Sequence, residues 1–170
     1  MLSDNKNRPA DLAALIEGLS EAGVEFVLVG GMAAVIQGVP VNTMDMDIVH
    51  YQTEENIKRL MKFLKSADAY YRRPDDKIIE PDERDLAAKG HALFSTRYGP
   101  LDVLAIIEKG LKYEELVPDS VETEFRGHKI KVLKLETMID LKRDSNDPKD
   151  IFRLPIFEET LRQINEKDHN

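Results

Sequence analysis

The chain has 170 residues, a formal net charge of −8 at pH 7 and a pI of about 5.1, so it lacks the basic field of a typical nucleic-acid-binding domain and no DNA partner is expected. It contains no cysteine, which excludes disulfides and thiolate metal sites. No stretch approaches the roughly 18 apolar residues of a membrane span, and the N-terminal MLSDNKNRPADLAAL has no apolar run of signal-peptide length, so we expect a cytoplasmic protein without a membrane partner.

The first third of the chain predicts helices that alternate with short buried strands. Residues 9–22 place apolar side chains at helical spacing behind Asp11, an acid that suits the positive end of a helix. The apolar run EFVLVGG (25–31) predicts a buried strand, and MAAVIQG (32–38) predicts a helix directly after it. DMDIVHY (45–51) predicts a second strand, and Thr53 is a suitable cap for the helix that follows.

The middle of the chain predicts a polar loop followed by antiparallel strands. Residues 68–90 are polar and irregular, with one short helix expected at 82–88. The segments HALFSTRYG and PLDVLAII (91–107) then predict a hairpin that turns at residues 98–100. A second, smaller hairpin is expected around Gly127.

The C-terminal part of the chain predicts helices. Residues 136–143 continue as one helix, and Asp147 and Pro148 predict the cap and the first position of another. Pro155 should kink or restart that second helix. The order of elements therefore predicts a single α/β (α+β) domain, in which helices flank one mixed β-sheet.

The segment TMDMD (43–47) places two carboxylates side by side. Asp45 and Asp47 share one face of the expected strand, while Met44 and Met46 should point from the other face into the core. Two carboxylates that lean toward one point need a shared proton or a cation, and a hard cation such as Mg²⁺ prefers oxygen ligands. The alternative interpretation is a solvated edge strand with two exposed aspartates.

Two further features could belong to the same site. Gly30 and Gly31 close a strand and open a helix, a junction whose free N–H groups suit phosphate, although a tight turn without a ligand has the same pattern. Neither the Rossmann nor the Walker A pattern is present. Asp102 leads a later apolar strand, where it could be a third metal ligand, a base for an incoming hydroxyl, or an acid that only flanks a hairpin.

The chain has one cluster of basic and aromatic residues, at 70–73. Arg72 and Arg73 follow Tyr70 and Tyr71, and such a cluster could stack on and pair with a nucleotide or an RNA acceptor. The alternative is a solvated loop whose long side chains carry no ligand.

Taken together, these parts resemble the nucleotidyltransferase superfamily with the polymerase-β-like fold. The segments VLVGGMAAVIQG, TMDMDIVH and STRYGPLDVL carry the resemblance, which runs from about Glu25 to Asp150. The chain is most similar to small bacterial and archaeal members, some of which resemble the nucleotidyltransferase halves of toxin–antitoxin pairs. LKRDSNDPKDI, near the C-terminus, resembles the lysine-bearing helix and the basic-Pro-Lys-Asp segment of that family.

The resemblance implies a palm-like nucleotidyltransferase fold in one domain over residues 1–170, with a core at about 24–110 and a C-terminal helical part at about 135–165. It also implies a role for each matching residue. Catalysis and the binding of Mg²⁺, or of Mn²⁺ in its place, fall to Asp45, Asp47 and Asp102, and nucleotide binding falls to Gly30, Gly31, Thr43, Lys142 and Lys149. Asp102 would in addition help to activate the acceptor.

The implied activity is the transfer of a nucleoside monophosphate from an NTP, such as ATP, to a hydroxyl group of a protein, an RNA or a small molecule. Two departures from the family pattern favour an alternative. Gly31 and Met32 supply no hydroxyl at the phosphate turn, and Asp147 stands where relatives often have a basic residue. In the alternative, an inactive nucleotidyltransferase-fold protein binds a nucleotide or a protein partner, as in a toxin–antitoxin pair. The three intact aspartates favour the enzyme.

Overall fold

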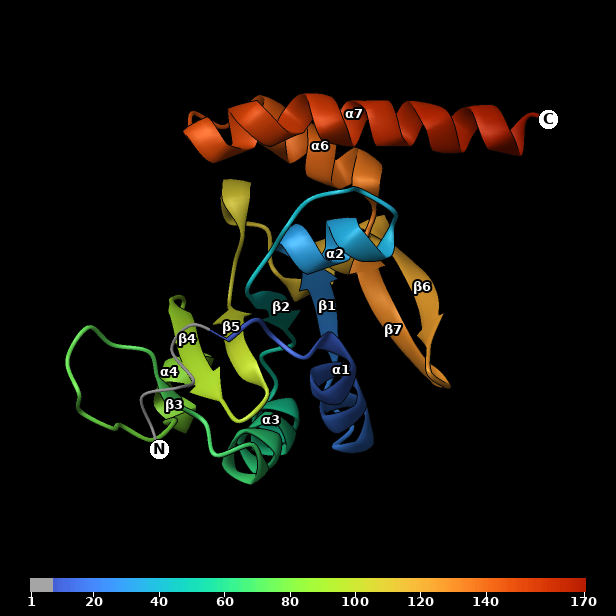
Figure 1. Cartoon of the computed structure of the whole chain (residues 1–170). Helices are drawn as coiled ribbons and strands as arrows, with labels where there is room; N and C mark the ends of the chain where they lie inside the picture. The colour runs from blue at the N-terminus through green and yellow to red at the C-terminus, as the bar shows by residue number, and fades with distance from the viewer. Residues whose placement is uncertain (1–7) are drawn as a thin grey trace.

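The computed structural model describes residues 8–170. The N-terminal segment in which the sequence shows no signal peptide therefore lies partly outside the described residues. One mixed seven-stranded sheet, ordered β3-β4-β5-β2-β1-β7-β6, runs through the protein, as the sequence predicts (Figure 1). The strands are β1 Phe26–Val29, β2 Met46–His50, β3 Tyr70–Tyr71, β4 His91–Thr96, β5 Gly99–Leu104, β6 Ser120–Phe125 and β7 His128–Leu133.

The centre of the sheet consists of short strands that are far apart in the sequence. β1 pairs antiparallel with β2 and parallel with β7, and β2 pairs parallel with β5. The two predicted hairpins are confirmed: β4 pairs antiparallel with β5, and β6 with β7. The four residues of β1 are all buried, as expected for a strand covered on both faces.

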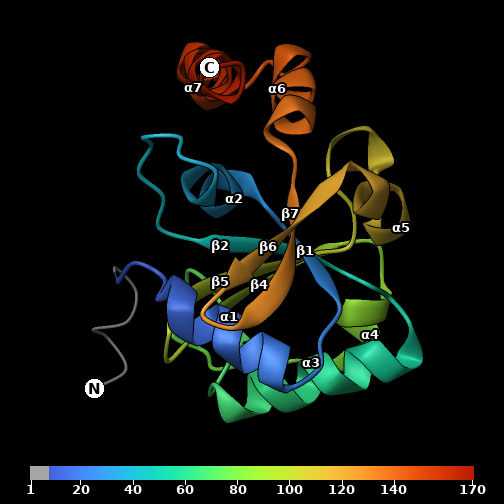
Figure 2. The same cartoon turned by 90° about the vertical axis from the view of Figure 1, so that its right-hand side faces the viewer.

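Helices α1 (Leu12–Glu21) and α3 (Glu54–Ser66) lie next to each other below the sheet in Figures 1 and 2. Helix α3 begins at the predicted cap, since Thr53 accepts a hydrogen bond from the Asn56 N–H. Helix α1 begins at Leu12 rather than at residue 9, because Asp11 is its cap and accepts from the Ala14 N–H. The inner faces of both helices are fully buried, and burial of each leucine contributes about 1.5–3 kcal/mol. The leucines at zero exposure are Leu15, Leu19, Leu60 and Leu64.

Three further helices lie beyond the end of β1: α2 (Gly30–Ile36), α6 (Leu135–Arg143) and α7 (Pro148–Asp168) (Figure 1). The side chain of Gln37 connects the first two, since its amide nitrogen donates to the Leu133 carbonyl at 2.9 Å and its oxygen accepts from the Leu135 N–H at 3.0 Å. This bond pair fixes the start of α6 against the end of α2. No helix within residues 8–170 is long and apolar enough to cross a membrane.

Helix α7 is continuous through Pro155, so the predicted restart at this residue is wrong. The proline ring removes the hydrogen bond to the Ile151 carbonyl, and both residues are exposed. Water can therefore satisfy that carbonyl. The predicted cap is confirmed, because the Asp147 carboxylate accepts from the Lys149 N–H at 2.8 Å.

Several short elements were not predicted. The polar region 68–90 contains the expected short helix, α4 (Glu83–Ala87), but also the edge strand β3, which pairs antiparallel with β4. After β5 follow the single turns η2 (Glu108–Gly110), α5 (Tyr113–Leu116) and η3 (Val117–Asp119). Elements of two to five residues are too short to display a helical or strand period in the sequence.

Candidate active site

The register of the central strands places the aspartates together. Asp47 on β2 pairs directly with Asp102 on β5, and on the other side of β2 it pairs with Val29, the last residue of β1. Asp45 lies just before β2 and is half-buried. The expectation that Met44 points into the core is wrong, since it is 49% exposed while Met46 is fully buried. The reason is that β2 begins at Met46, so the alternation does not reach Met44.

The glycine pair is in close contact with the TMDMD segment. Gly30 has a φ of +69°, and a Cβ atom there would lie 2.2 Å from Oδ2 of Asp47. A Cβ atom on Gly31 would lie 2.7 Å from Oγ1 of Thr43. Thr43 in turn donates to the Asp45 carbonyl at 3.3 Å, and so helps to shape the turn before β2. Glycine at position 30 therefore lets the Asp47 carboxylate approach the end of β1, and glycine at position 31 lets the Thr43 side chain approach the start of α2.

The carboxyl groups perturb each other's protonation. Burial above all, together with the nearby Asp102 and Asp45, raises the pKa of Asp47 to about 7, while Lys149 acts in the opposite direction. Burial also raises the pKa of Asp102, although the Arg72 guanidinium beside it lowers that pKa. The side chains of Asp47 and Asp102 are within hydrogen-bond reach of each other. Without a cation, the pair therefore retains a shared proton near neutral pH.

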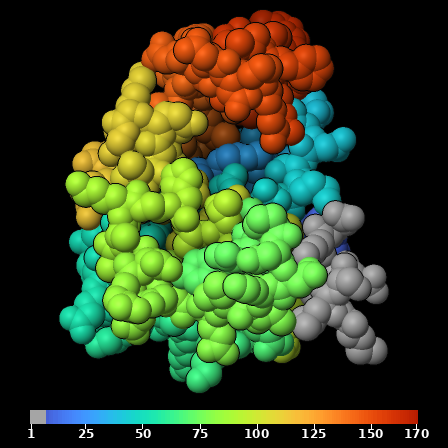
Figure 3. Space-filling model, turned by 90° about the vertical axis from the view of Figure 1, so that its left-hand side faces the viewer, coloured from blue at the N-terminus to red at the C-terminus, as the bar shows by residue number. Residues whose placement is uncertain are grey.

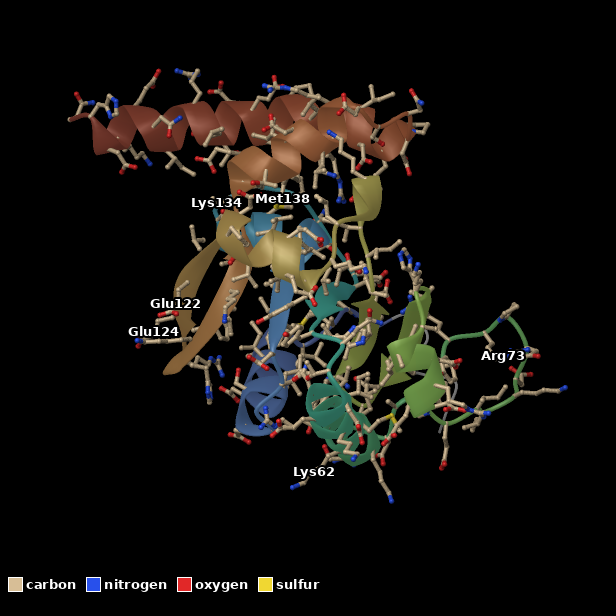
Figure 4. All side chains as sticks on the ribbon, turned by 180° about the vertical axis from the view of Figure 1, so that it is seen from behind. Lys62, Arg73, Glu122, Glu124, Lys134 and Met138 are labelled. Carbon is tan, nitrogen blue, oxygen red and sulfur yellow. The ribbon has the colours of Figure 1, made fainter. Side chains whose placement is uncertain are left out.

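The sequence did not predict the contact between Arg72 and Asp102. The Nη2 atom of Arg72 lies 2.6 Å from Oδ1 of Asp102, and its Nη1 atom donates to the Phe94 carbonyl at 3.4 Å. Arg73 instead lies out on the 73–82 loop, where it pairs with Asp75 (Figure 4). The basic–aromatic cluster is thus divided between a site residue and a solvated loop.

A cleft of about 140 Å³ opens next to Asp47. Its floor is the end of β1 with Gly30, its roof is α6, and a further wall comes from the chain after β5. In Figure 3 a hollow lies beneath the C-terminal helices, with the blue and teal of residues around 30–50 at its base, and Figure 4 labels Met138, a residue of α6. The lining residues are Val29, Gly30, Asp47, Leu104, Ile107, Glu108, Leu133, Met138, Leu141 and Lys142.

The two predicted lysines have different surroundings. Lys142 lines the cleft, but its Nζ atom lies 2.6 Å from Oδ1 of Asp150 and 5.0 Å from the ring centre of Phe157. Both members of this ion pair are about four-fifths shielded, so Lys142 links α6 to α7. Lys149 is exposed, and its charge reaches Asp47. Lys149 is therefore the freer of the two to meet a phosphate.

Within residues 8–170, no group of three or more histidine, aspartate or glutamate side chains is already arranged around a common metal position. The donor chemistry nevertheless fits Mg²⁺ or Mn²⁺. Asp45 and Asp47 supply only oxygen ligands, as these cations prefer, and glycine at position 30 leaves space beside Oδ2 of Asp47 that a Cβ atom would fill.

No family model matches the chain, and no curated protein matches it. Solved structures do match. The lincomycin-bound lincosamide antibiotic adenylyltransferase LnuA is 14% identical with a TM-score of 0.60, over 91% of this chain and 99% of that one. An antigenic nucleotidyltransferase-like protein from Paracoccidioides brasiliensis is 14% identical with a TM-score of 0.56, over 88% and 77%. ANT(2″)-Ia in complex with adenylyl-2″-tobramycin is 14% identical with a TM-score of 0.54, over 86% and 85%.

These similarities show that the chain has the nucleotidyltransferase fold, which confirms the fold that the sequence predicts. The similarity extends over most of this chain. The residue roles within the site rest on the geometry described above and on the motif resemblance.

Proposed function

We propose that the protein is a nucleotidyltransferase that uses Mg²⁺ or Mn²⁺ to transfer a nucleoside monophosphate from an NTP to a hydroxyl acceptor. One observation carries this proposal: the register places Asp47 beside Asp102, and Gly30 lies in contact with Asp47 at the end of β1. In a nucleotidyltransferase fold, this arrangement brings two carboxylates next to a glycine turn whose backbone a phosphate group can approach closely.

Each residue then has a role in an in-line attack of the acceptor oxygen on the α-phosphorus, from which pyrophosphate leaves. Asp45 and Asp47 hold the divalent cation, which when bound neutralises the developing phosphate charge. Asp102 takes the proton of the acceptor hydroxyl, and Arg72 fixes the orientation of its carboxylate. Gly30 and Gly31 let the phosphates approach the backbone, while Thr43 maintains the turn.

The remaining contacts concern the ends of the nucleotide. Lys149 is exposed near Asp47 and supplies positive charge to the triphosphate, whereas Lys142 contributes mainly by holding α6 over the cleft. The cleft of about 140 Å³ is smaller than the roughly 300 Å³ or more of a typical ligand pocket, so it takes only one part of the nucleotide.

The test is transfer of label from each of the four α-labelled NTPs, in the presence of Mg²⁺, to separate acceptors. The acceptors are a mixed RNA preparation, proteins of a cell extract, and a lincosamide and an aminoglycoside, the classes named for the structural neighbours. Asp47→Asn keeps the side-chain shape and should reduce transfer more than about 100-fold, the scale of a lost electrostatic stabiliser. The absence of both transfer and metal-dependent NTP binding would contradict the proposal.

A second function, as an inactive nucleotide- or partner-binding module, has its own support. Ile151 and Phe152 at the start of α7 are 59% and 77% exposed, as at a surface that binds a protein. Lys142 is also engaged by Asp150 rather than free for phosphate. Calorimetry separates the two functions: NTP binding that is independent of Mg²⁺ and unchanged by Asp45→Ala, without any transfer, would favour the binding module.

A further inference from the structure

Arg72 places a positive charge beside Asp102, one member of the carboxylate cluster. Its guanidinium bonds Oδ1 of Asp102 at 2.6 Å, and the two side chains are only 29% and 13% exposed. The neighbouring pair of Arg73 and Asp75 is 43% and 41% exposed, which is typical of a surface ion pair that contributes little. The contact between Arg72 and Asp102 is therefore shielded from solvent and from salt to a greater degree.

The position of Arg72 is set by the sheet. Its backbone N–H donates to the Leu93 carbonyl at 2.8 Å, which continues the pairing of β3 with β4. Leu93 in turn pairs directly with Asp102 across β4 and β5. The backbone of Arg72 thus lies two strands from Asp102 in the same register, and its long side chain spans the intervening strand.

The ion pair between Arg72 and Asp102 lowers the negative charge that is available to bind cations. Asp45, Asp47 and Asp102 together carry three negative charges when ionised, and Arg72 reduces the net charge of the cluster to two negative charges. One divalent cation then balances the cluster completely. A second would have to bind Asp102 next to a guanidinium that already occupies one of its oxygens, against like-charge repulsion.

We propose that Arg72 is a positioning residue that occupies Asp102 and restricts the carboxylate cluster to a single divalent cation, held by Asp45 and Asp47. This inference rests on the proposed function, because it assumes that the cluster binds a divalent cation. It assigns Asp102 to the acceptor hydroxyl rather than to a second metal ion. It also gives residue 72, in a region that the sequence predicts as loop, a specific task in the site.

The test is titration of the full-length chain with Mn²⁺ alone. Binding is measured by calorimetry and, separately, by the electron paramagnetic resonance signal of free Mn²⁺. The wild-type chain should bind one Mn²⁺. Arg72→Ala should bind two, with the first bound about tenfold more tightly because the competing cation is gone. Arg72→Lys, which retains the charge, should bind one, and Arg73→Ala, a matched arginine removal on the adjacent loop, should behave as wild type.

The outcomes separate this inference from the proposed function. If wild type binds one Mn²⁺ and Arg72→Ala binds one with unchanged affinity, or if wild type binds two, the role of Arg72 is refuted while metal binding stands. If no variant binds Mn²⁺ in the absence of nucleotide, the role of Arg72 is refuted, and the proposed function is then decided by metal-dependent NTP binding and transfer. Binding by Arg72→Ala alone would support the role of Arg72 and contradict a metal-dependent wild-type enzyme. Circular dichroism confirms folding, and Arg72→Gln replaces the alanine variant if that variant unfolds.

Discussion

Gly30→Ala tests whether the contact between the glycine turn and Asp47 organises the site. The new methyl group would lie 2.2 Å from Oδ2 of Asp47 and 3.0 Å from its Cγ, so the carboxylate must move away from the end of β1. The substitution also puts an alanine at a φ of +69°, a conformation that glycine adopts without strain. Both effects destabilise the protein, and the first also displaces a proposed metal ligand.

The two effects can be separated, because Gly110 has nearly the same backbone angle, a φ of +71°, and no atom within 4 Å of a Cβ built there. The left-handed conformation costs an alanine about 1–2 kcal/mol at either position. At position 30 the displaced carboxylate adds about 1–3 kcal/mol, the range for an over-packed site. We therefore expect a loss of roughly 2–5 kcal/mol for Gly30→Ala and 1–2 kcal/mol for Gly110→Ala.

Urea unfolding of the two variants and the wild type measures this difference in the free energy of unfolding. Mn²⁺ titration of the same samples should show affinity at least about tenfold weaker for Gly30→Ala, since 1.4 kcal/mol corresponds to a factor of ten. Gly110→Ala should bind Mn²⁺ as the wild type does. Equal destabilisation by both substitutions, together with unchanged Mn²⁺ affinity in Gly30→Ala, would refute the reasoning about the Asp47 contact.

Three further predictions concern charges in and around the site. The folded-state pKa of Asp47 is about 7 against an ordinary 3.8, so the folded chain holds a proton that the unfolded chain lacks between these values. In EDTA, the Asp47 contribution to the free energy of unfolding should therefore fall as the pH rises from about 4 to 7, and Asp47→Asn should remove this contribution to the slope in urea unfolding at several pH values. Lys142→Ala should lower stability by about 1–3 kcal/mol, because it leaves the largely shielded Asp150 without its cationic partner, whereas Lys149→Ala should leave stability within about 0.5 kcal/mol and weaken NTP binding in calorimetry. Asp147→Ala should cost about 1 kcal/mol through loss of the α7 cap, measured by thermal unfolding.

Each of these predictions has an outcome that contradicts it. A rising or flat contribution from Asp47 between pH 4 and 7 would show that its carboxyl group is not buried against Asp102. Equal loss of stability in the two lysine variants would show that Lys142 has no special role in joining α6 and α7. An unchanged melting temperature in Asp147→Ala, with weaker NTP binding, would assign the aspartate to the nucleotide rather than to the helix.

The parts of the fold that the sequence predicts well are those with strong local signals. The run of apolar residues before Gly30 identifies β1, and Asp11, Thr53 and Asp147 mark helix starts because short polar side chains satisfy the first free N–H groups. The proximity of Asp47 and Asp102 could be anticipated only through the motif resemblance. It depends on a parallel pairing of strands that lie far apart in the chain, and no local pattern encodes that register.

The site contacts that the sequence does not predict follow from long-range packing. Arg72 reaches Asp102 because a two-residue edge strand extends the sheet, and two residues carry no period. Ile107 and Glu108 line the cleft from an irregular segment without a motif. The engagement of Lys142 by Asp150 follows from the packing of α6 against α7, which the helical pattern of either segment does not specify.

The two hydrogen bonds of Gln37 have a mechanical consequence for the cleft. They anchor the N-terminal end of α6 to the end of α2. We therefore expect any movement of α6 over the cleft to be a rotation about Leu135. Met138 lies about one helical turn from Leu135, and Lys142 lies about two turns from it. We expect any widening of the cleft to be small near Met138 and larger near Lys142, so that a ligand enters from the side where α7 begins.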